Sequence, residues 1–534
     1  MVFDNEKKKF FSKFLKKNKK IIFKKENNFS TLIIDRGRFL AALQSSLFAS
    51  IKNKKNSHNV YTLISNPKNE DLINFYKSFG ENRIFKLRSN FIYTIFYTII
   101  SLFISLINFV KVKIKGIQWF IENFRVNKII LGDLIYDSHI RFDHKYISFN
   151  PNISFFKVLL VSVFKCLMIN HFLKKLNVKT IIISQDLMAT NGGIAVRLGN
   201  KNNIKVIEPA CNYKRNHYFI VHTKNNFKYG VDNFYYNNLK FNKIKFNKLR
   251  FSEKKINTFL KRRLEGKIEV NYTGIIDLMN ANKSKKIFNK KDLLNQLKVK
   301  NRKINKIYLF APHAFSDAPH GQGKEILFRD YYSHCKETLN FIKNNNFKNS
   351  LWIVRPHPTR IKYGEKKIFN DLFKKEIGKK NKQIKLCPDQ INTLSLLNIC
   401  DHVVTLKGTI AIEFASYGKK AITCATTPYS KMGVTLEANT KSKYFKNIIK
   451  THKGNSFISK KQKKIAQKIL YSMETFTPSN MIGNSKILTK ELMRRLSSPS
   501  KDLDHELFSS ETIKKLEIYG FNNDSYYNDL YKLL

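Results

Sequence analysis

Short apolar runs alternate with helical stretches along much of the chain. The first run, "TLIID", ends at Asp35, and the following "RFLAALQSSLFASI" has the apolar spacing of a helix. Further strand candidates in the first half are "VYTLIS", "RIFKL", "KIILGD", "TIIISQD" and "IKVIE". A second series contains "KIYLFAP", "LWIVRP", "IKLCP", "HVVTL" and "KAITCA". Strands that alternate with helices predict an α/β fold with parallel sheets covered by helices on both faces.

The two series predict two domains. A chain of 534 residues is too long for one ordinary domain and suits two large ones with extensions. We expect Rossmann-like domains at residues 31–223 and 306–480, joined by a Lys/Asn-rich helical connection at 224–305. Residues 1–30 form a basic N-terminal extension, and the polar residues 481–534 predict a helical C-terminal extension.

Two segments favour contact with a membrane. Within "KKKFFSKFLKKNKKIIFKK" (Lys7–Lys25), apolar side chains gather near one helical face, which predicts either a basic amphipathic helix on an anionic leaflet or a solvated basic tail. Phe91–Val110 is twenty residues without a charge, long enough to span a bilayer. Because it falls inside the α/β series and contains Tyr, Thr, Ser and Asn, we interpret it as a buried or membrane-facing helix.

The net charge predicts anionic partners. The chain has 98 Lys and Arg against 39 Asp and Glu, a formal charge of +59. Phosphorylated substrates, acidic polysaccharide and an anionic membrane face would all be attracted. Lysine far outnumbers arginine, and a specific reader of nucleic acid would more often cluster Arg and aromatic residues on one element. We therefore expect non-specific binding to DNA or RNA, and no specific nucleic-acid partner.

Cysteine usage and the N-terminus bear on the compartment. The six cysteines are scattered without a Cys-X-X-Cys pair, which fits a reducing environment and argues against a zinc ribbon or a disulfide scaffold. The N-terminal segment lacks the continuous apolar run of a signal peptide, because lysines interrupt its apolar residues. We expect a cytoplasmic protein.

One candidate site follows the strand in "LWIVRPHPTR". Prolines flank His357, so the backbone is fixed and lacks two amide donors. The imidazole and the guanidinium of Arg355 must then supply the polar contacts, a pairing that suits a phosphate or carboxylate ligand. A structural turn with a hydrogen-bonded histidine is the alternative interpretation.

A second candidate lies in "DHVVTLKGTIAIEFASYGKKAITCA". Gly408 and Thr409 stand where a helix from Ile410 begins, and free backbone amides at that point attract anions. Lys407 adds a positive charge. Glu413, about one turn into the helix, can accept both hydroxyls of a ribose or another sugar. An ordinary strand–helix turn is the alternative.

The loop after the first strand of the second series carries His313 and Asp317. Both can act as general acid, general base or sugar-hydroxyl ligand, although each can also be a turn residue that bonds its own backbone. All three loops follow parallel strands at their carboxyl ends, so we expect them to open into one crevice. "GQGK" mimics part of a phosphate-binding loop, but Glu325 follows its lysine where Ser or Thr is needed, which excludes an ATPase of that kind.

The first half has weaker candidates, because Gly and Asp also belong in such turns for conformational reasons. The residues that follow its strands or open its helices are Asp35, Arg36, Asp133, Asp137, Arg141, Gly192, Gly193 and Arg197.

Several motifs together point to a known family. "HAFSDAPHG", "FRDYY", "ETL", "RPHP", "VVTLKGTIAIEFASYGKKAI" and "GDLIYDSHIR" resemble the capsule and surface-polysaccharide biosynthesis proteins. These are glycosyltransferase-like chains of GT-B type, distantly similar to the capsule Kdo transferases and the CDP-glycerol glycerophosphotransferases. The resemblance covers about Thr31 to Tyr429 and is most specific between Phe310 and Tyr429.

The resemblance implies two facing Rossmann-like domains, with a nucleotide-activated donor on the C-terminal half and an acceptor against the N-terminal half. Glu413 matches the glutamate that binds the donor's ribose or sugar, and His357 matches the histidine of the family's "HP" motif. Lys407 precedes "GT" where a small residue is usual, which leaves the donor's identity open. Residues 306–480 contain no Asp-X-Asp motif, as fits a GT-B enzyme, which needs no bound metal.

The expected protein is a cytoplasmic glycosyltransferase that is peripherally associated with an anionic membrane surface. It would transfer a sugar from a CMP-, UDP- or CDP-linked donor to a growing glycan or lipid-linked acceptor, without metal or cofactor. Asp317, His357 and His313 are the catalytic candidates; the donor-binding candidates are Arg355, Lys407, Gly408, Thr409 and Glu413. The first-half residues become acceptor-side candidates. The alternatives are a nucleotide-sugar epimerase or hydrolase of the same fold and a non-catalytic scaffold that binds anionic polysaccharide.

Overall fold

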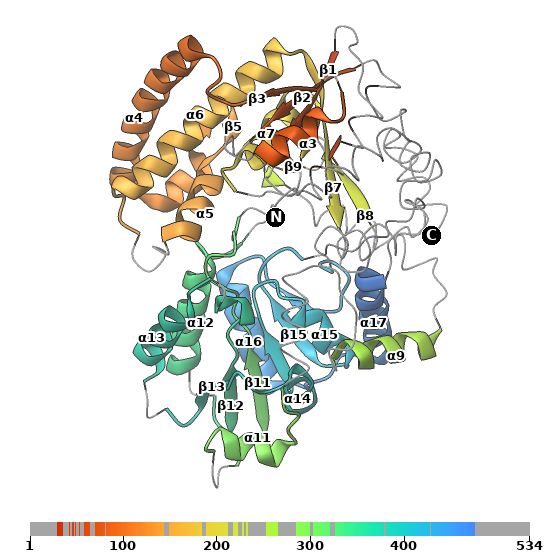
Figure 1. Cartoon of the computed structure of the whole chain (residues 1–534). Helices are drawn as coiled ribbons and strands as arrows, with labels where there is room; N and C mark the ends of the chain where they lie inside the picture. Colours follow the sequence, from red (N-terminus) through yellow and green to blue (C-terminus); the bar gives the residue numbers. More distant parts are fainter. Residues whose placement is uncertain are drawn as a thin grey trace. The chain divides into compact units, whose positions relative to one another are not determined.

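The structure is a computed structural model whose described residues fall into two compact units (Figure 1). Described residues up to 232 belong to unit 1 and those from 252 belong to unit 2. The described residues are 29–35, 42, 45, 46, 49, 53, 58–64, 70–80, 82–143, 149–183, 188–211, 217–222, 227–228, 231–232, 252–264, 285–299, 303–320, 326–345, 347–361, 363–378, 381–427 and 429–475. The predicted helix at Lys7–Lys25 and the extension at 481–534 lie outside them.

Unit 1 contains a six-stranded sheet of order β3-β2-β1-β6-β7-β8. All neighbouring strands are parallel except β7 and β8, which are antiparallel. Counted along the chain this is the order 3-2-1-4-5-6 of a Rossmann fold. The strands are β1 (Phe29–Ile34), β2 (His58–Leu63), β3 (Asn82–Phe85), β6 (Val178–Ile183), β7 (Lys205–Cys211) and β8 (His217–His222). The helices are α3 (Glu70–Lys77), α4 (Phe91–Asn123), α5 (Gly132–Asp143), α6 (Ile153–Lys175) and α7 (Asn191–Lys201).

Unit 2 has the same strand order, β13-β12-β11-β14-β15-β16, and all its strands are parallel. The strands are β11 (Lys306–Phe310), β12 (Ser350–Val354), β13 (Ile384–Leu386), β14 (His402–Val404), β15 (Lys420–Thr423) and β16 (Leu436–Glu437). The helices are α12 (Tyr331–Asn344), η3 (Pro358–Arg360), α13 (Lys366–Ile377), α14 (Thr393–Ile399), α15 (Ile410–Ser416), α16 (Lys441–Lys453) and α17 (Lys460–Thr475). The prediction of an α/β chain with two Rossmann-like domains is therefore confirmed.

One predicted strand was wrong. "KIILGD" does not join the sheet of unit 1; within it, β5 (Ile129–Ile130) pairs antiparallel with β4 (Arg125–Val126). Asn127 and Lys128 connect them with φ values of 50° and 63°, the left-handed backbone of a tight hairpin turn. Helix α5 then begins at Gly132, where a Cβ would lie 1.9 Å from the carbonyl oxygen of Phe120. The hairpin and this close approach leave no length for a sheet strand.

The stretch predicted as an interdomain connection is partly built into unit 2. The described part of this stretch contains two helices, α9 (Glu253–Leu264) and α11 (Lys290–Gln296), in agreement with its predicted helical character. Phe259 of α9 and Leu293 of α11 are buried in the same apolar core as Ile307 of β11 and Leu351 of β12. Helix α9 also packs against α17. These two helices therefore belong to the body of unit 2. Two short antiparallel strands, β9 (Phe227–Lys228) and β10 (Val231–Asp232), precede them.

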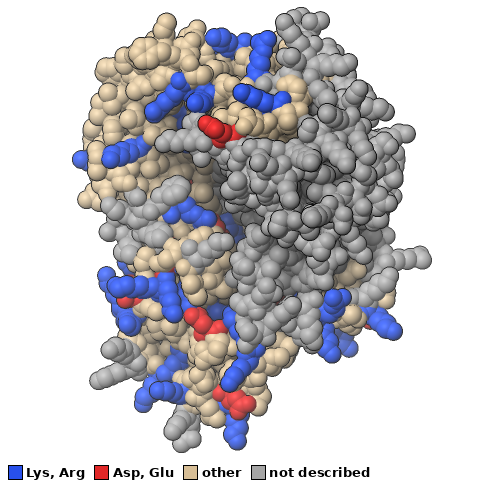
Figure 2. Space-filling view, in the orientation of Figure 1, with Lys and Arg blue, Asp and Glu red and all other residues tan. Residues whose placement is uncertain are grey.

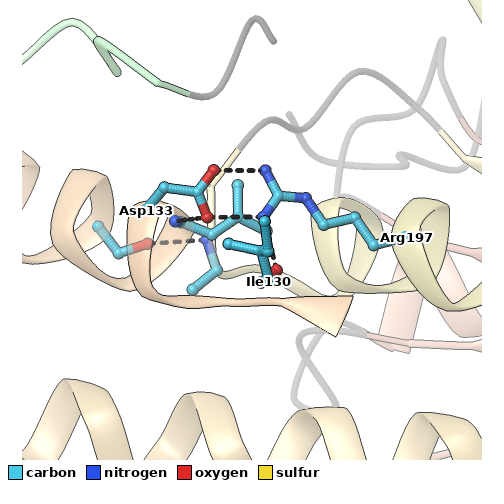
Figure 3. A network of polar contacts seen from close by, with 6 residues as sticks. Ile130, Asp133 and Arg197 are labelled. Atoms are coloured by element: carbon cyan, nitrogen blue, oxygen red, sulfur yellow. Dashed lines mark hydrogen bonds and ion pairs between the residues drawn. The ribbon is translucent and has the colours of Figure 1, made fainter. Parts of the chain in front are cut away.

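A buried ion pair joins α5 to α7 in unit 1 (Figure 3). Arg197 Nη1 and Nη2 donate to the two carboxylate oxygens of Asp133 at 2.6 and 2.7 Å, and Nη1 also donates to the carbonyl of Ile130 at 2.6 Å. The two side chains are only 3% and 5% exposed. A bidentate guanidinium–carboxylate pair with a further hydrogen bond satisfies charges that would otherwise be costly to bury.

Replacing one partner of this pair should strongly destabilise unit 1. In Asp133→Ala the guanidinium of Arg197 stays buried without its counter-charge, which costs about 3–5 kcal/mol. Asp371→Ala, which removes an exposed pair with Lys367, is the matched control and should leave the unfolding midpoint nearly unchanged. Urea unfolding of the full chain measures both. Equal midpoints for the two variants would contradict the role assigned to Asp133.

Candidate functional site

Two loops of unit 2 meet where its strand order reverses. Strands β11 and β14 are neighbours, and the loops that follow them leave the carboxyl ends of the sheet. Thr405 Oγ1, after β14, donates to the carbonyl of Ala311, after β11, at 2.7 Å. Lys407 Nζ lies 3.5 Å from the carbonyl oxygen of Pro319. The structure therefore brings together the two loops in which the sequence placed Lys407 and His313.

The third predicted loop joins them through a set of stacked rings. The ring of His313 stacks on Tyr331 at 4.7 Å between centroids and on His357 at 5.9 Å. Lys407 Nζ lies 5.1 Å from the centroid of the Tyr331 ring, a cation–π contact. Tyr331, the first residue of α12, thus contacts His313 and Lys407, and His313 links it to His357. Tyr331 was not predicted as a site residue, although it lies in the quoted motif "FRDYY".

The contacts of His357 define its chemistry. The backbone N–H of Thr359 donates to His357 Nδ1 at 3.3 Å, and the Thr359 hydroxyl lies 2.6 Å from the same atom. Burial lowers the pKa of His357; Arg360 and Arg355 lower it further, against the opposing effect of Asp317. A neutral imidazole whose Nδ1 accepts carries its proton on Nε2. We assign that tautomer from the hydrogen bonds, and it makes Nε2–H a donor.

A cluster of cations surrounds the loop after β12. Arg360 Nη2 donates to Asp389 at 2.6 Å, and its side chain is buried. Burial and then the charge of Arg355 lower the pKa of Lys285, which also interacts with Asp389 and Arg360. Arg355 Nη1 is buried, and no acceptor among the described residues lies within hydrogen-bond distance of it. Lys285, Arg355 and Arg360 thus lie close together, and Asp389 accepts a hydrogen bond from Arg360. This local excess of positive charge suits the binding of an anion.

Sequence reasoning found only Arg355 of this cluster. Arg360 is the last residue of the segment "LWIVRPHPTR", but it lies after the "RPHP" motif and was not named as a candidate. Lys285 lies in the stretch interpreted as a connection, where no pattern distinguishes it from its many neighbouring lysines. The segment is fixed in place because Lys286 N donates to the carbonyl of Gln390 and Asn392 N donates to that of Lys286, both at 3.0 Å. Lys285 lies near the end of β13 only in the folded chain, so the sequence alone does not indicate its position.

The loop after β11 is fixed by Glu365, at the N-terminus of α13. Its buried carboxylate accepts the backbone N–H groups of Phe315 and Ser316 at 2.8 and 2.7 Å. Tyr363 donates its hydroxyl to Asp317 Oδ1 at 3.2 Å. These contacts position Asp317, the predicted base. Nothing in the sequence indicated either partner.

Glu413 lies one turn into α15, as predicted, but its carboxylate has a protein partner. Arg263 of α9 donates to Oε1 from Nε at 3.1 Å and from Nη2 at 2.8 Å. The two side chains are 15% and 10% exposed. Thr409 precedes the helix without a side-chain capping bond, and a Cβ on Gly408 would come within 3.0 Å of Thr405 Oγ1. A side chain at position 408 would therefore require Thr405 to shift.

The acceptor-side candidates of unit 1 are distributed differently from the prediction. Asp133 and Arg197 bind each other in the interior, and Asp35 is buried and accepts the hydroxyl of Tyr76 at 3.0 Å. All three were expected on open loops, but in the structure each is buried and bonded to another side chain of unit 1. The remaining candidates are Asp137, which is buried in α5; Arg141, in the last turn of α5; Gly192 and Gly193, in the first turn of α7; and Arg36, which lies outside the described residues. An acceptor role for these stays a prediction.

Solved structures resemble the chain at low identity. The beta Kdo 2,4 transferase of Thermosulfurimonas dismutans KpsC is 12% identical, with a TM-score of 0.31, over 55% of this chain and 79% of that chain. The UDP-GlcNAc 2-epimerase of Methanocaldococcus jannaschii, in complex with UDP-GlcNAc and UDP, is 14% identical, with a TM-score of 0.24, over 83% and 98%. A glycosyltransferase from Rickettsia africae ESF-5 is 10% identical, with a TM-score of 0.26, over 89% and 100%. No curated protein gives a significant match.

The segment that contains the loops after β11, β12 and β14 resembles a known protein family. Residues 270–457 match the family described as capsule polysaccharide biosynthesis protein. This range includes every donor-side residue named above except Arg263. For residues 31–269 the resemblance stays a prediction from the motifs. The match over residues 270–457 agrees with the resemblance that the motifs of this segment indicate.

Proposed function

We propose that the protein is a glycosyltransferase of capsule or surface-polysaccharide synthesis, using a nucleotide-activated sugar as donor and a growing glycan or lipid-linked acceptor. One observation carries the proposal. Tyr331 contacts His313 and Lys407, and His313 also stacks on His357, at the carboxyl edge of a Rossmann sheet and inside the segment that matches the family. This position, at the reversal of strand order, is where open α/β sheets bind their ligands.

The cations of this edge suit the donor's phosphate groups. As the nucleotide leaves, negative charge grows on the phosphate oxygens, and fixed donors that face them lower the barrier. Arg355, Arg360 and Lys285 supply positive charge beside the neutral Nε2–H of His357. Lys407 supplies a further charge from the loop after β14. The donor is a substrate, and no cofactor or metal forms part of the proposal.

Asp317 is the proposed base for the acceptor hydroxyl. Its bond from Tyr363 holds one oxygen, Oδ1, in a fixed direction. In this proposal a carboxylate accepts the acceptor's proton while the hydroxyl oxygen attacks the donor sugar and the nucleotide departs. His313, stacked between Tyr331 and His357, orients the reacting groups. The acceptor side is assigned to unit 1, whose remaining candidates include Arg141 of α5 and the two glycines of α7.

Product analysis separates this proposal from its two rivals. The purified protein is incubated with a nucleotide sugar, with and without a capsule-type acceptor. A transferase releases nucleotide mainly when acceptor is present and lengthens the acceptor. An epimerase or hydrolase converts the donor without acceptor, and a scaffold binds anionic polysaccharide but leaves the donor unchanged. Either of the last two results would refute glycosyl transfer.

Substitution of His357 should lower turnover without unfolding the protein. Loss of one hydrogen-bond donor that acts in the transition state costs about 10²–10³ in rate, and we expect that loss for His357→Ala. His452→Ala is the matched control, because His452 is a partly buried histidine of α16, outside the three loops. Steady-state transfer rates measure the effect. Near-wild-type turnover in a folded His357→Ala protein would place the chemistry elsewhere.

Glu413→Ala should chiefly raise the KM for the donor. A hydroxyl contact that is made in both the ground state and the transition state affects binding more than turnover. Arg263→Met provides the control, because it breaks the same ion pair but leaves the carboxylate in place. We expect a smaller rise in KM for Arg263→Met than for Glu413→Ala. If both variants raise KM equally, Glu413 acts only through its ion pair and does not bind the donor.

A further inference from the structure

Helix α4 packs against α6 along one side. Tyr97, Ser101, Ser105 and Val112 recur at the spacing of one helical face. The last three are buried, and the Tyr97 hydroxyl lies 3.2 Å from His171 Nδ1 of α6. This contact holds α4 along the side of unit 1 (Figure 1).

The opposite side of α4 is apolar and exposed. We call it the α4 face and define it by Ile92, Phe96, Ile99, Phe103, Ile107 and Val110, which recur every three or four residues. Their exposed fractions run from 50% to 75%. In Figure 2 the surface over α4, at the upper left, is mostly uncharged, with Lys and Arg side chains beside it. An ordinary soluble protein exposes large apolar side chains singly, whereas here they form a continuous row.

The surroundings of α4 argue against a membrane span. Both α4 and α6 are long and apolar enough to cross a bilayer by length and composition alone. However, Leu159, Cys166 and Ile169 of α6 are buried in the core of unit 1 together with Ile181 of β6. Helix α6 is therefore part of the α/β body, and α4 is packed along it. Helix α4 can enter a bilayer only sideways, by its exposed face.

Cations border the α4 face at both ends. Lys111, Lys113 and Lys115 follow it, and the last two lie over the rings of Phe109 and Trp119 at 4.9 and 5.0 Å. At the start of the helix, Lys175 lies over the ring of Tyr93 at 5.0 Å, and Arg88 precedes the helix. A second copy of the chain that paired through this face, in either direction, would bring cations against cations. Anionic lipid headgroups would neutralise both ends.

We propose that the α4 face is a membrane-binding surface that lies in the plane of an anionic bilayer. Its large side chains enter the region between headgroups and acyl chains, while the lysines at its ends contact lipid phosphates, as in interfacial amphipathic helices. The inference goes beyond the proposed transfer reaction. Lipid binding is measured without donor or acceptor, so either proposal can fail while the other stands.

Vesicle flotation of the full chain tests this surface. Wild-type protein should float with vesicles of phosphatidylcholine and phosphatidylglycerol, and less with phosphatidylcholine alone. The double variant Phe96→Glu/Phe103→Glu should bind at least about tenfold more weakly, because two large apolar groups are lost and two negative charges are added. Phe457→Glu is the matched control: Phe457 is 58% exposed in unit 2, and its variant should float like the wild type. Lys111→Gln/Lys113→Gln should reduce the preference for phosphatidylglycerol.

Three results would overturn the proposal. The first is unchanged flotation of a folded Phe96→Glu/Phe103→Glu protein, which would assign lipid binding to another segment. The second is wild-type protein that stays with the membrane pellet through carbonate washing, as a spanning helix would. The third is wild-type protein that ignores vesicles but self-associates, with the double variant monomeric by light scattering; the face would then bind a second copy. Circular dichroism checks that each variant is folded.

Discussion

The central strands of unit 2 are buried on both faces, and this constraint decides where its chemistry can lie. Every residue of β12 is buried, as are the last four residues of β11, so a polar side chain finds solvent only beyond the strand ends. The order 3-2-1-4-5-6 then makes the carboxyl ends of β11, β12 and β14 neighbours. Loops far apart in the sequence are thereby brought together around Tyr331, and the proposed donor site follows from this arrangement.

The positive charge of the chain serves several physical purposes. Inside unit 1, Arg197 is neutralised by Asp133 and holds two helices together. Beside β12, Lys285, Arg355 and Arg360 outnumber the carboxylate of Asp389, so the excess charge favours an anionic ligand. Along α4 the lysines stand at the ends of an apolar face. Net charge alone does not distinguish these uses; burial and the neighbouring carboxylates do.

The apolar runs were sufficient to predict both Rossmann-like domains, because strands buried on both faces read as uninterrupted apolar segments. The exception, "KIILGD", is equally apolar. It forms a hairpin instead of a strand of the sheet because of the turn at Asn127 and the close contact of Gly132 with Phe120. The motifs located His313, His357 and Lys407 because these residues follow strands closely. Lys285 and Arg263 could not be found this way, since they reach the site from a stretch without a distinguishing pattern.

The most direct test of a donor site in unit 2 is a thermal-unfolding screen of the full chain with CMP-, UDP-, GDP- and CDP-linked sugars. A ligand at about 100 times its Kd stabilises the folded protein by about 2.7 kcal/mol, a readily measured shift. The account predicts that one nucleotide class raises the unfolding temperature and that Arg355→Met abolishes the shift. If none of the four classes raises it, while an acidic polysaccharide does, the protein is a binding scaffold and the donor site does not exist.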